Sequence, residues 1–327
     1  MDLTRRAALG TALTLPVAAM AQPRPTWPDR PVRFLQGFAG GGTTDILARI
    51  IAPHMAAALG QPVVVENRPG AGGTLAAEAL ARSTDGHTLM LLNNGFAVAA
   101  ALYRRLPYDP RADIEPVAMV ASTGLVLLVA PLGAPDTPAD LPDLVRRARA
   151  RPEALNVATV GVGSTQHFVS EAVQAAGDFR LTHVAYRGTP AALIALRNHE
   201  VQVVAETASA VLGQIRGGEV RALAITSRTR SPLLPEVPTV AEALGIADFE
   251  IDTWFAIGAP ARTPGFVLDR ISDVARGLNG NAELRARLAD LGLTPREAGT
   301  PASTRTLVHG EITRWTDVVE RTRMERQ

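Results

Sequence analysis

The feature that most constrains this fold is a strand that runs into a glycine-rich turn and then into a helix, an arrangement that occurs twice near the start of the chain. The first turn, residues 37–45 (GFAGGGTTD), follows the apolar run 32–36. The second, residues 66–73 (ENRPGAGG), follows the run 63–66. The first amides of a helix have no partner within the helix, so each turn aims free N–H groups at one point. This geometry suits a bound anion.

Apolar runs of strand length alternate with helical patterns along most of the chain. Strands are expected at 32–36, 63–66, 88–92, 155–160, 181–184, 201–205 and 222–226. Helices are expected at 45–59, 74–81, 166–176, 190–198 and 211–217, and an amphipathic helix within 297–327 is expected to pack on the first lobe. This βαβ rhythm predicts an α/β fold with mainly parallel sheets flanked by helices.

The length of the chain points to two lobes. About 305 residues remain after an export signal, more than one compact core of about 150 residues. Apolar or alternating runs at 125–130 and 249–257 are interpreted as two crossing strands that join the lobes. Residues 22–124 and 250–327 would then form the first lobe and residues 125–249 the second. Two strand hinges would let the lobes close on a ligand in the cleft between them.

The first 21 residues have the pattern of an export signal rather than of folded structure. Arg5 and Arg6 precede an apolar stretch at 7–17, too short to span a bilayer, and a small-x-small cleavage site stands at 19–21. The two arginines resemble a twin-arginine signal, but Ala8 stands where that pattern prefers a bulky apolar residue, so Sec and Tat export both stay open. The chain has no cysteine for a lipid anchor or a disulfide. A freely diffusing periplasmic protein is expected, as a monomer.

The charge balance argues against a nucleic-acid partner. The sequence has 33 basic and 32 acidic residues, and removing the signal leaves equal numbers of each. Because the chain has no basic field, an anion would have to be selected by local dipoles and hydrogen bonds. Histidines and acidic residues show no metal-ligand spacing in the sequence, so neither a metal nor a cofactor is expected.

From the residues alone, the main alternative to a binding protein is an enzyme of the same compartment, namely a periplasmic hydrolase. Gly163 and Ser164 are not part of a Gly-x-Ser-x-Gly motif. The turn at 40–44 lacks the lysine of a phosphate-binding P-loop. No catalytic residue is therefore assigned, and a binding protein is favoured over an enzyme.

Nine short blocks, in order along nearly all of the chain after the signal, resemble those of the tripartite tricarboxylate transporter substrate-binding proteins, also called Bug receptors. The blocks are 27–32 (WPDRPV), 40–45 (GGGTTD), 66–73 (ENRPGAGG), 85–89 (DGHTL), 102–109 (LYRRLPYD), 163–167 (GSTQH), 186–191 (YRGTPA), 221–224 (RALA) and 238–242 (PTVAE). The resemblance implies a type II periplasmic binding protein fold with Venus-flytrap closure. It also implies delivery of a small mono- or dicarboxylate, including amino and aromatic acids, to a membrane permease. A receptor that serves a sensor kinase would use the same pocket, so that role stays open.

The resemblance also implies which residues bind the ligand. In the first lobe, the loop that would receive one carboxylate consists of Phe38, Ala39, Gly40, Gly41, Gly42, Thr43, Thr44 and Asp45. Thr43 or Thr44 is expected to cap the helix, and Phe38 to form an apolar wall. The lead-in at 36–38 lacks a proline that relatives often have, which is expected to loosen this loop.

Further ligand contacts are expected mainly from the second lobe. The candidates are Asn94, Gly163, Ser164, Thr165, His167, Tyr186, Gly188, Thr189 and Glu206. Hydroxyls and amides would bind the other end of the ligand, whereas Arg187 is expected to point to solvent. Glu206 would act as a counter-charge for a ligand amino group or as a bridge to water.

Overall fold

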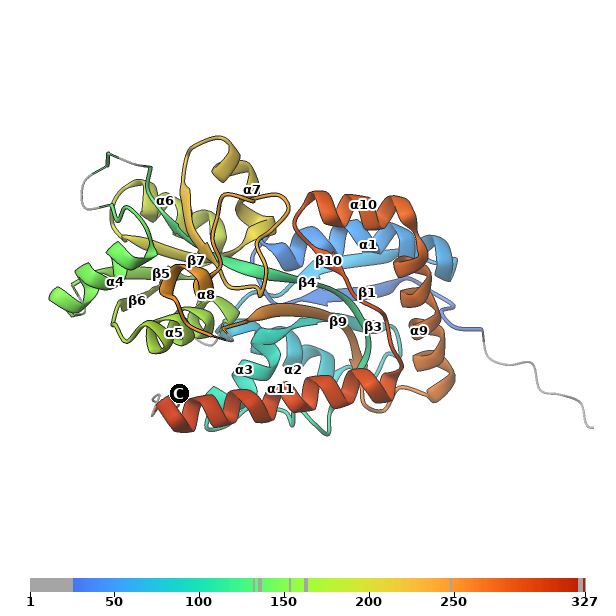
Figure 1. Ribbon diagram of the computed structural model, residues 1–327. Coiled ribbons are helices and arrows are strands. Elements are labelled where there is room, and N and C mark those ends of the chain that lie inside the picture. Colours follow the sequence, from blue (N-terminus) through green and yellow to red (C-terminus); the bar gives the residue numbers. More distant parts are fainter. Residues whose placement is uncertain are drawn as a thin grey trace, which may run out of the picture.

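The protein is an α/β molecule of two lobes, seen in a computed structural model that describes residues 26–322 and Arg326, apart from residues 132, 135, 136, 153, 162, 163 and 248. The expected export signal at 1–21 lies outside the described residues. Figure 1 shows the lobes beside each other, with a long strand running between them. The expected α/β class is therefore confirmed.

One sheet continues through both lobes, in the order β2-β1-β3-β9-β4-β7-β5-β6, and β8 and β10 pair with β4. The strands are β1 (Val32–Gln36), β2 (Val63–Asn67), β3 (Thr88–Asn93), β4 (Ile114–Val129), β5 (Asn156–Thr159), β6 (Thr182–Ala185), β7 (Val203–Thr207), β8 (Arg221–Ile225), β9 (Asp252–Pro260) and β10 (Thr294–Pro295). The strands of the βαβ units are parallel: β1 pairs with β2 and β3, and β5 with β6 and β7. Strands β4 and β9 make antiparallel pairs. Because β9 begins at Asp252 and pairs with β3 and with β4 before Leu125, the second expected crossing strand lies within the first lobe.

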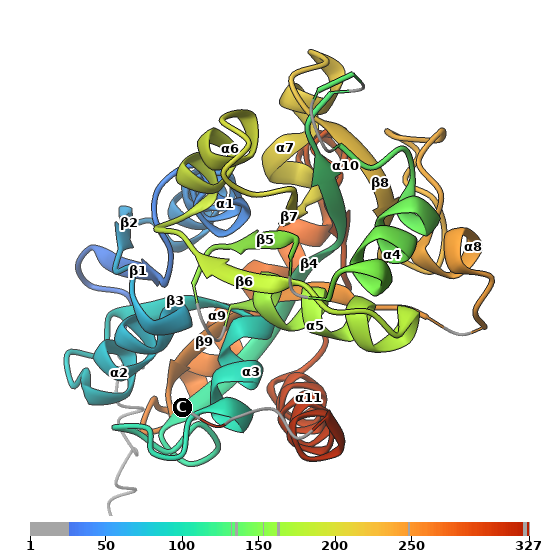
Figure 2. The same ribbon diagram turned by 90° about the vertical axis from the view of Figure 1, so that its left-hand side faces the viewer.

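Helices cover both faces of the sheet. They are α1 (Thr43–Leu59), α2 (Thr74–Arg82), α3 (Asn94–Leu102), α4 (Leu141–Ala150), α5 (Thr165–Gly177), α6 (Thr189–Arg197), α7 (Ala208–Arg216), α8 (Val240–Leu244), α9 (Gly265–Gly280), α10 (Ala282–Asp290) and α11 (Pro301–Thr322), with the short 3-10 turn η1 (Ala71–Gly73). In Figure 2, α6 and α7 lie on one side of β5 and β7, and α4 and α5 lie on the other.

Strand β4 is longer than the sequence pattern indicated. Only the run 125–130 was expected as a strand, but β4 begins at Ile114. Its first part pairs with β9 and β10, and from Leu125 onward it pairs with β7 and β8. Pro116 and the small residues at 121–124 (ASTG) obscured the first part, because they break the apolar pattern of a strand. One strand thus passes from the first lobe to the second.

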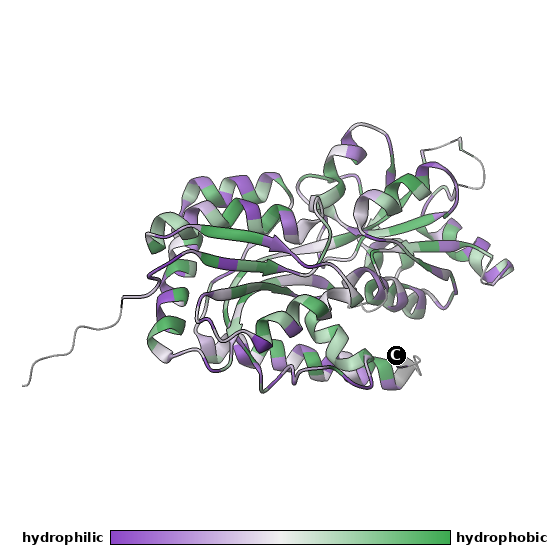
Figure 3. Ribbon diagram, turned by 180° about the vertical axis from the view of Figure 1, so that it is seen from behind, coloured by the Kyte–Doolittle hydropathy of each residue, from purple (hydrophilic) through white to green (hydrophobic). Residues whose placement is uncertain are grey.

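The core runs across the boundary between the lobes. Buried side chains of β4, of β9 and of helices from both lobes form one cluster, and Figure 3 shows apolar strands beneath helices whose outer sides are hydrophilic. The C-terminal helix α11 packs on α3. Trp315 of α11 also meets Phe168 of α5 edge to face, with ring centroids 5.5 Å apart. Helix α11 therefore contacts both lobes, not the first lobe alone.

Candidate functional site

A cavity lies where helices of both lobes begin. It is lined by Phe38, Ala39, Gly42, Thr43, Thr44, Asn93, Val160, Thr165, Gln166, Gly188, Thr189, Thr207, Thr253 and Phe255. The volume of this cavity is about 30 Å³, which is enough for about two or three water molecules. An adjoining groove of about 570 Å³ shares Phe38, Ala39, Val160 and Gly188 with it.

Five helices present their first residues to this cavity. The lining residues Gly42, Asn93, Gly188 and Thr207 are the N-caps of α1, α3, α6 and α7, and Thr165 is the first residue of α5. Each helix start carries roughly half a positive charge and unpaired amides. No lysine, arginine or histidine is among the described residues that line the cavity. Helix dipoles and polar side chains are therefore the groups of this lining that could attract an anion.

The first loop is held by Gln36, contrary to the expected loosening. The Gln36 amide donates to the Phe38 carbonyl at 2.6 Å, and the Phe38 N–H donates to Gln36 Oε1 at 2.8 Å. Gly37 passes so close to Gly73 that a Cβ at residue 37 would lie 2.7 Å from the Gly73 Cα atom. A side-chain clamp and a close backbone approach thus replace the missing proline.

Thr43 and Thr44 do not cap the first helix. Gly42 is the N-cap of α1 and has no side-chain cap, so the two threonines become its first buried turn. The Thr43 hydroxyl contacts the hydroxyls of Thr207 and Ser209, the latter at 2.7 Å. These contacts join the first lobe to the second across the cavity.

Asp45 is bound within its own lobe rather than directed at a ligand. The Gly41 N–H donates to its carboxylate at 3.1 Å, and Asn67 donates at 2.9 Å. Arg49, one turn along the helix, also donates at 2.9 Å. Burial opposes ionisation of Asp45, but these hydrogen bonds outweigh it and lower the pKa of the carboxyl. Gly40, Gly41 and Asp45 accordingly shape the loop, and none of them lines the cavity.

We expect Asp45→Asn to destabilise the protein by about 1–3 kcal/mol, because an amide cannot accept all the hydrogen bonds that the buried carboxylate receives from Gly41, Arg49 and Asn67. The lowered pKa of Asp45 stabilises the folded state above the ordinary value of 3.8, and this stabilisation is lost as pH falls through the lower folded pKa. Urea unfolding at a series of pH values should therefore show a difference between the two proteins that is largest near neutrality and shrinks in acid.

The matched control is Asp273→Asn, which removes an exposed ion pair with Arg276 and should change stability by no more than about 1 kcal/mol. A difference between Asp45→Asn and wild type that persists unchanged in acid would contradict the ionised role of Asp45.

Glu206 lies behind the wall of the cavity. It is fully buried, and its carboxylate accepts hydrogen bonds from Gln166 at 2.9 Å and from Thr189 at 2.5 Å. The N–H and the hydroxyl of Thr207 donate to it at 2.7 and 2.9 Å. All three partners line the cavity, whereas Glu206 itself does not. Its oxygens are already bonded, so Glu206 positions other residues instead of meeting a ligand amino group.

Some of the remaining second-lobe candidates line the cavity, and others lie in the adjoining groove or inside the lobe. Thr165, Gly188 and Thr189 line the cavity, and Tyr186 lines the adjoining groove with Arg187, which is exposed as expected. Ser164 is fully buried and its hydroxyl caps α5 by accepting from the His167 N–H at 3.3 Å. Gly163 lies outside the described residues.

His167 does not supply a positive charge to the cavity. It is the third residue of α5 rather than its start, and it is not among the lining residues. Burial, reinforced by the neighbouring His183, lowers the pKa of His167 to about 4. Its imidazole is therefore neutral at pH 7.

The structure places Asn93, rather than the expected Asn94, at the cavity. The Asn93 side chain caps α3, a helix that sequence reasoning missed, and donates to the Thr44 hydroxyl at 3.3 Å. Asn94 donates to the Asp252 carbonyl at 3.0 Å and accepts from the Trp254 N–H at 2.8 Å. It thus ties α3 to β9.

Sequence reasoning also missed several other lining residues, namely Val160, Gln166, Thr207, Thr253 and Phe255. Val160 ends the predicted strand 155–160, Gln166 begins the helix predicted after it, and Thr207 follows the predicted strand 201–205. The rule that parallel strands present their carboxyl ends to a ligand could therefore have found them. Thr253 and Phe255 lie inside β9, and no local signal marks them.

Helix starts from both lobes meet at a cavity whose described lining residues carry no positive charge, an arrangement typical of a two-lobed solute receptor. The chain belongs to the family of tripartite tricarboxylate transporter receptors: residues 47–324 match the model described as "Tripartite tricarboxylate transporter family receptor". The resemblance read from the nine blocks is thereby confirmed. Members of this family are periplasmic solute-binding receptors. Among the helices of the described chain, none is both long and apolar enough to cross a membrane.

Relatives and solved structures of the family resemble this chain over nearly its whole length. "Protein BugT" of Bordetella pertussis is 37% identical over 328 residues, covering 98% of both chains. The structure "R. palustris Rpa4515 with adipate" has a TM-score of 0.83 and 33% identity, covering 90% of this chain and 97% of that one. "MatC (Rpa3494) from Rhodopseudomonas palustris with bound malate" has a TM-score of 0.82 and 34% identity, covering 90% and 100%.

Proposed function

We propose that this protein is a periplasmic receptor, not an enzyme, that captures a small organic carboxylate between its lobes and delivers it to a tripartite tricarboxylate-type membrane permease. The observation that carries the proposal is the convergence of five helix starts on one cavity. The adipate and malate of the two family structures favour a dicarboxylate as the ligand.

The energetics of carboxylate binding support this role. Removing a carboxylate from water costs several kcal/mol unless its oxygens receive hydrogen bonds. Free amides and hydroxyls at helix starts supply such donors, and they are fixed in place before the ligand arrives. The residues proposed to contact the ligand are Gly42, Thr43, Thr44, Asn93, Thr165, Gln166, Gly188 and Thr189, between the apolar walls Phe38 and Phe255. We expect a dissociation constant in the micromolar range or below, about −8 kcal/mol or stronger.

The two lobes are proposed to part and close around the ligand. The cavity of about 30 Å³ holds only a few waters, so an organic acid enters when the lobes separate. Residues 22–124 and 250–327 are proposed to move as one lobe and residues 125–249 as the other. The change in backbone angles would occur within β4, which passes from the first lobe to the second, and in the chain just before β9.

A thermal-shift screen of the purified mature protein tests the proposal. Malate, succinate, adipate, amino acids and aromatic acids are added one at a time, and the dimethyl ester of each active dicarboxylate serves as its uncharged control. At a concentration of 100 times Kd, a ligand stabilises the folded state by about 2.7 kcal/mol. We expect at least one free acid to raise Tm and its ester to have no effect.

The screen can overturn the proposal. Absence of stabilisation by every carboxylate, together with turnover of an ester or amide, would establish the hydrolase alternative. Delivery to a permease is tested separately in a deletion strain: uptake of the radiolabelled ligand should fail and return with the gene, and the protein should be recovered in the periplasmic fraction. Normal uptake in the deletion strain would remove the transport role.

A further inference from the structure

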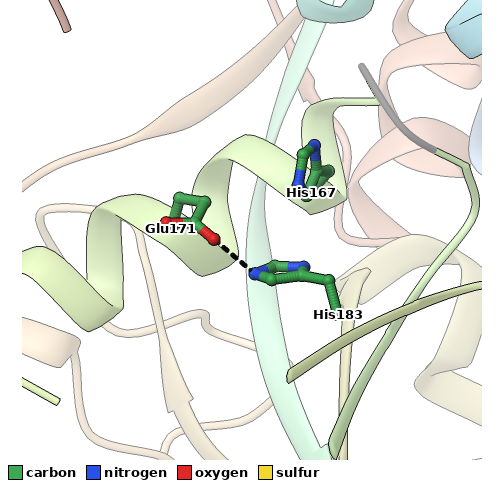
Figure 4. A group of neighbouring side chains, drawn as sticks. All are labelled: His167, Glu171 and His183. Carbon is green, nitrogen blue, oxygen red and sulfur yellow. Dashed lines mark ion pairs between the residues drawn. The ribbon is translucent and has the colours of Figure 1, made fainter. Parts of the chain in front are cut away.

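Three side chains with metal-ligating atoms gather beside the cavity, at His167, Glu171 and His183. His167 and Glu171 lie one turn apart on α5, and His183 comes from the neighbouring strand β6. One ligating atom from each residue lies within 4.8 Å of the others. In Figure 4 the two α5 side chains and His183 approach one another from their separate elements. The spacing of these residues in the sequence does not indicate a metal site, because His183 lies on a different element from the other two.

The protein alone does not satisfy the hydrogen-bonding groups of His183. Its Nε2 atom lies 2.7 Å from the Glu171 carboxylate and 3.0 Å from the amide nitrogen of Gln174. The Leu181 N–H donates to the Gln174 oxygen at 2.6 Å, which fixes the Gln174 nitrogen toward His183. A protonated Nε2 suits Glu171 but meets a second donor at Gln174, and an unprotonated Nε2 suits Gln174 but faces the Glu171 anion.

The other ring nitrogen of His183 adds a second unsatisfied group. His183 Nδ1 is buried and has no hydrogen-bond partner within the described structure. A buried polar atom without a partner is uncommon in folded proteins and calls for an explanation. A cation bound at Nδ1 would give this atom a partner, whereas a cation bound at Nε2 would remove the conflict with the Glu171 anion.

We propose that His167, Glu171 and His183 bind a divalent transition-metal ion, with Zn²⁺ as the ion that fits best. Two imidazoles and one carboxylate form a known three-residue zinc set that leaves a fourth position to water. The ligating atoms lie within 4.8 Å of one another, so side-chain rotations would have to bring them to metal–ligand bonds of about 2.0–2.2 Å. A bound ion would tie α5 to β6 and so stabilise the second lobe.

Isothermal titration of ZnCl₂ into tag-free mature protein, stripped with EDTA and free of carboxylates, tests this proposal. We expect one saturable site and a higher Tm in the presence of Zn²⁺. Mg²⁺ should not bind, because it prefers sites built from oxygen ligands alone. His183→Ala and Glu171→Gln should each lower the Zn²⁺ affinity at least about tenfold, since even outer-shell partners of a metal contribute 10–100-fold.

His54→Ala is the matched control, because His54 is also a partly exposed histidine on a helix and its replacement should leave Zn²⁺ affinity unchanged. Glu171→Gln keeps the size of the side chain, so it remains informative if His183→Ala unfolds; far-UV circular dichroism checks both. The proposal is overturned if wild type shows no saturable site, or if the folded ligand variants bind Zn²⁺ as tightly as wild type. This test does not depend on carboxylate binding. The proposed receptor function could therefore be wrong while the metal site is still found, and the reverse.

Discussion

Gly188→Leu is expected to abolish carboxylate binding, lowering affinity at least about 100-fold, which corresponds to about 2.8 kcal/mol. Gly188 is the N-cap of α6 in the second lobe and lines the cavity. A Cβ at this position would lie 3.0 Å from the Ala39 Cβ atom of the first lobe. The longer leucine side chain would push the lobes apart, so the helix starts on the two sides could not reach one ligand.

The measurement is titration calorimetry with the strongest acid from the thermal-shift screen. Gly188 has a φ of +99°, so any side chain there also strains the backbone. Gly218→Leu separates the two effects: Gly218 lies in an exposed turn at φ +71° with no atom near its would-be Cβ. We expect that control to bind normally, with some loss of stability. Wild-type affinity in Gly188→Leu would show that the two loops need not meet around the ligand.

Glu206→Gln is expected to reduce both stability and ligand affinity. The carboxylate receives hydrogen bonds from Gln166, Thr189 and Thr207. An amide replaces one acceptor oxygen by a donor nitrogen, which leaves at least one buried donor without a partner, at a cost of about 1–3 kcal/mol. We expect urea unfolding to report that loss and calorimetry to report affinity lowered about tenfold or more.

Ligand selectivity separates a positioning role of Glu206 from a purely structural one. Because Thr189 donates its hydroxyl proton to Glu206, the Thr189 oxygen presents lone pairs to the cavity. It can accept a hydrogen bond from a ligand hydroxyl, so malate should lose more affinity than succinate in Glu206→Gln. The control is Glu219→Gln, which removes an exposed ion pair with Arg197 in the same lobe and should alter neither measurement. Equal losses for the two acids would contradict the contact between Thr189 and a ligand hydroxyl, and unchanged affinity for both would assign Glu206 to stability alone.

Local patterns predicted the elements that carry the site. Strand β1 has the expected bounds, and α1, α5, α6 and α7 begin within three residues of their expected starts. The starts and ends of these elements depend on hydrophobic periodicity and glycine turns, which involve residues close together in sequence. The element bounds could therefore be predicted from the sequence. Helix α3 was missed: its N-cap is Asn93, and its first residue is Asn94, which was expected to contact the ligand.

The roles of particular polar residues could not be predicted in the same way. Asp45, Asn94 and Glu206 were expected at the ligand, but each is bonded to groups of the protein. Thr207 lines the cavity and was not expected there. Whether a polar side chain binds a ligand or stabilises the fold depends on which groups the tertiary structure brings within hydrogen-bond distance of it.

The sequence by itself determined the α/β class, the glycine turns that open helices, and the family to which the chain belongs, because these follow from local composition and order. Only the tertiary structure decided that five helix starts meet at one cavity, that Glu206 stands behind it, and that His183 joins two residues of α5. These features arise from contacts between residues far apart in the chain, and such contacts form only when the strands and helices pack together.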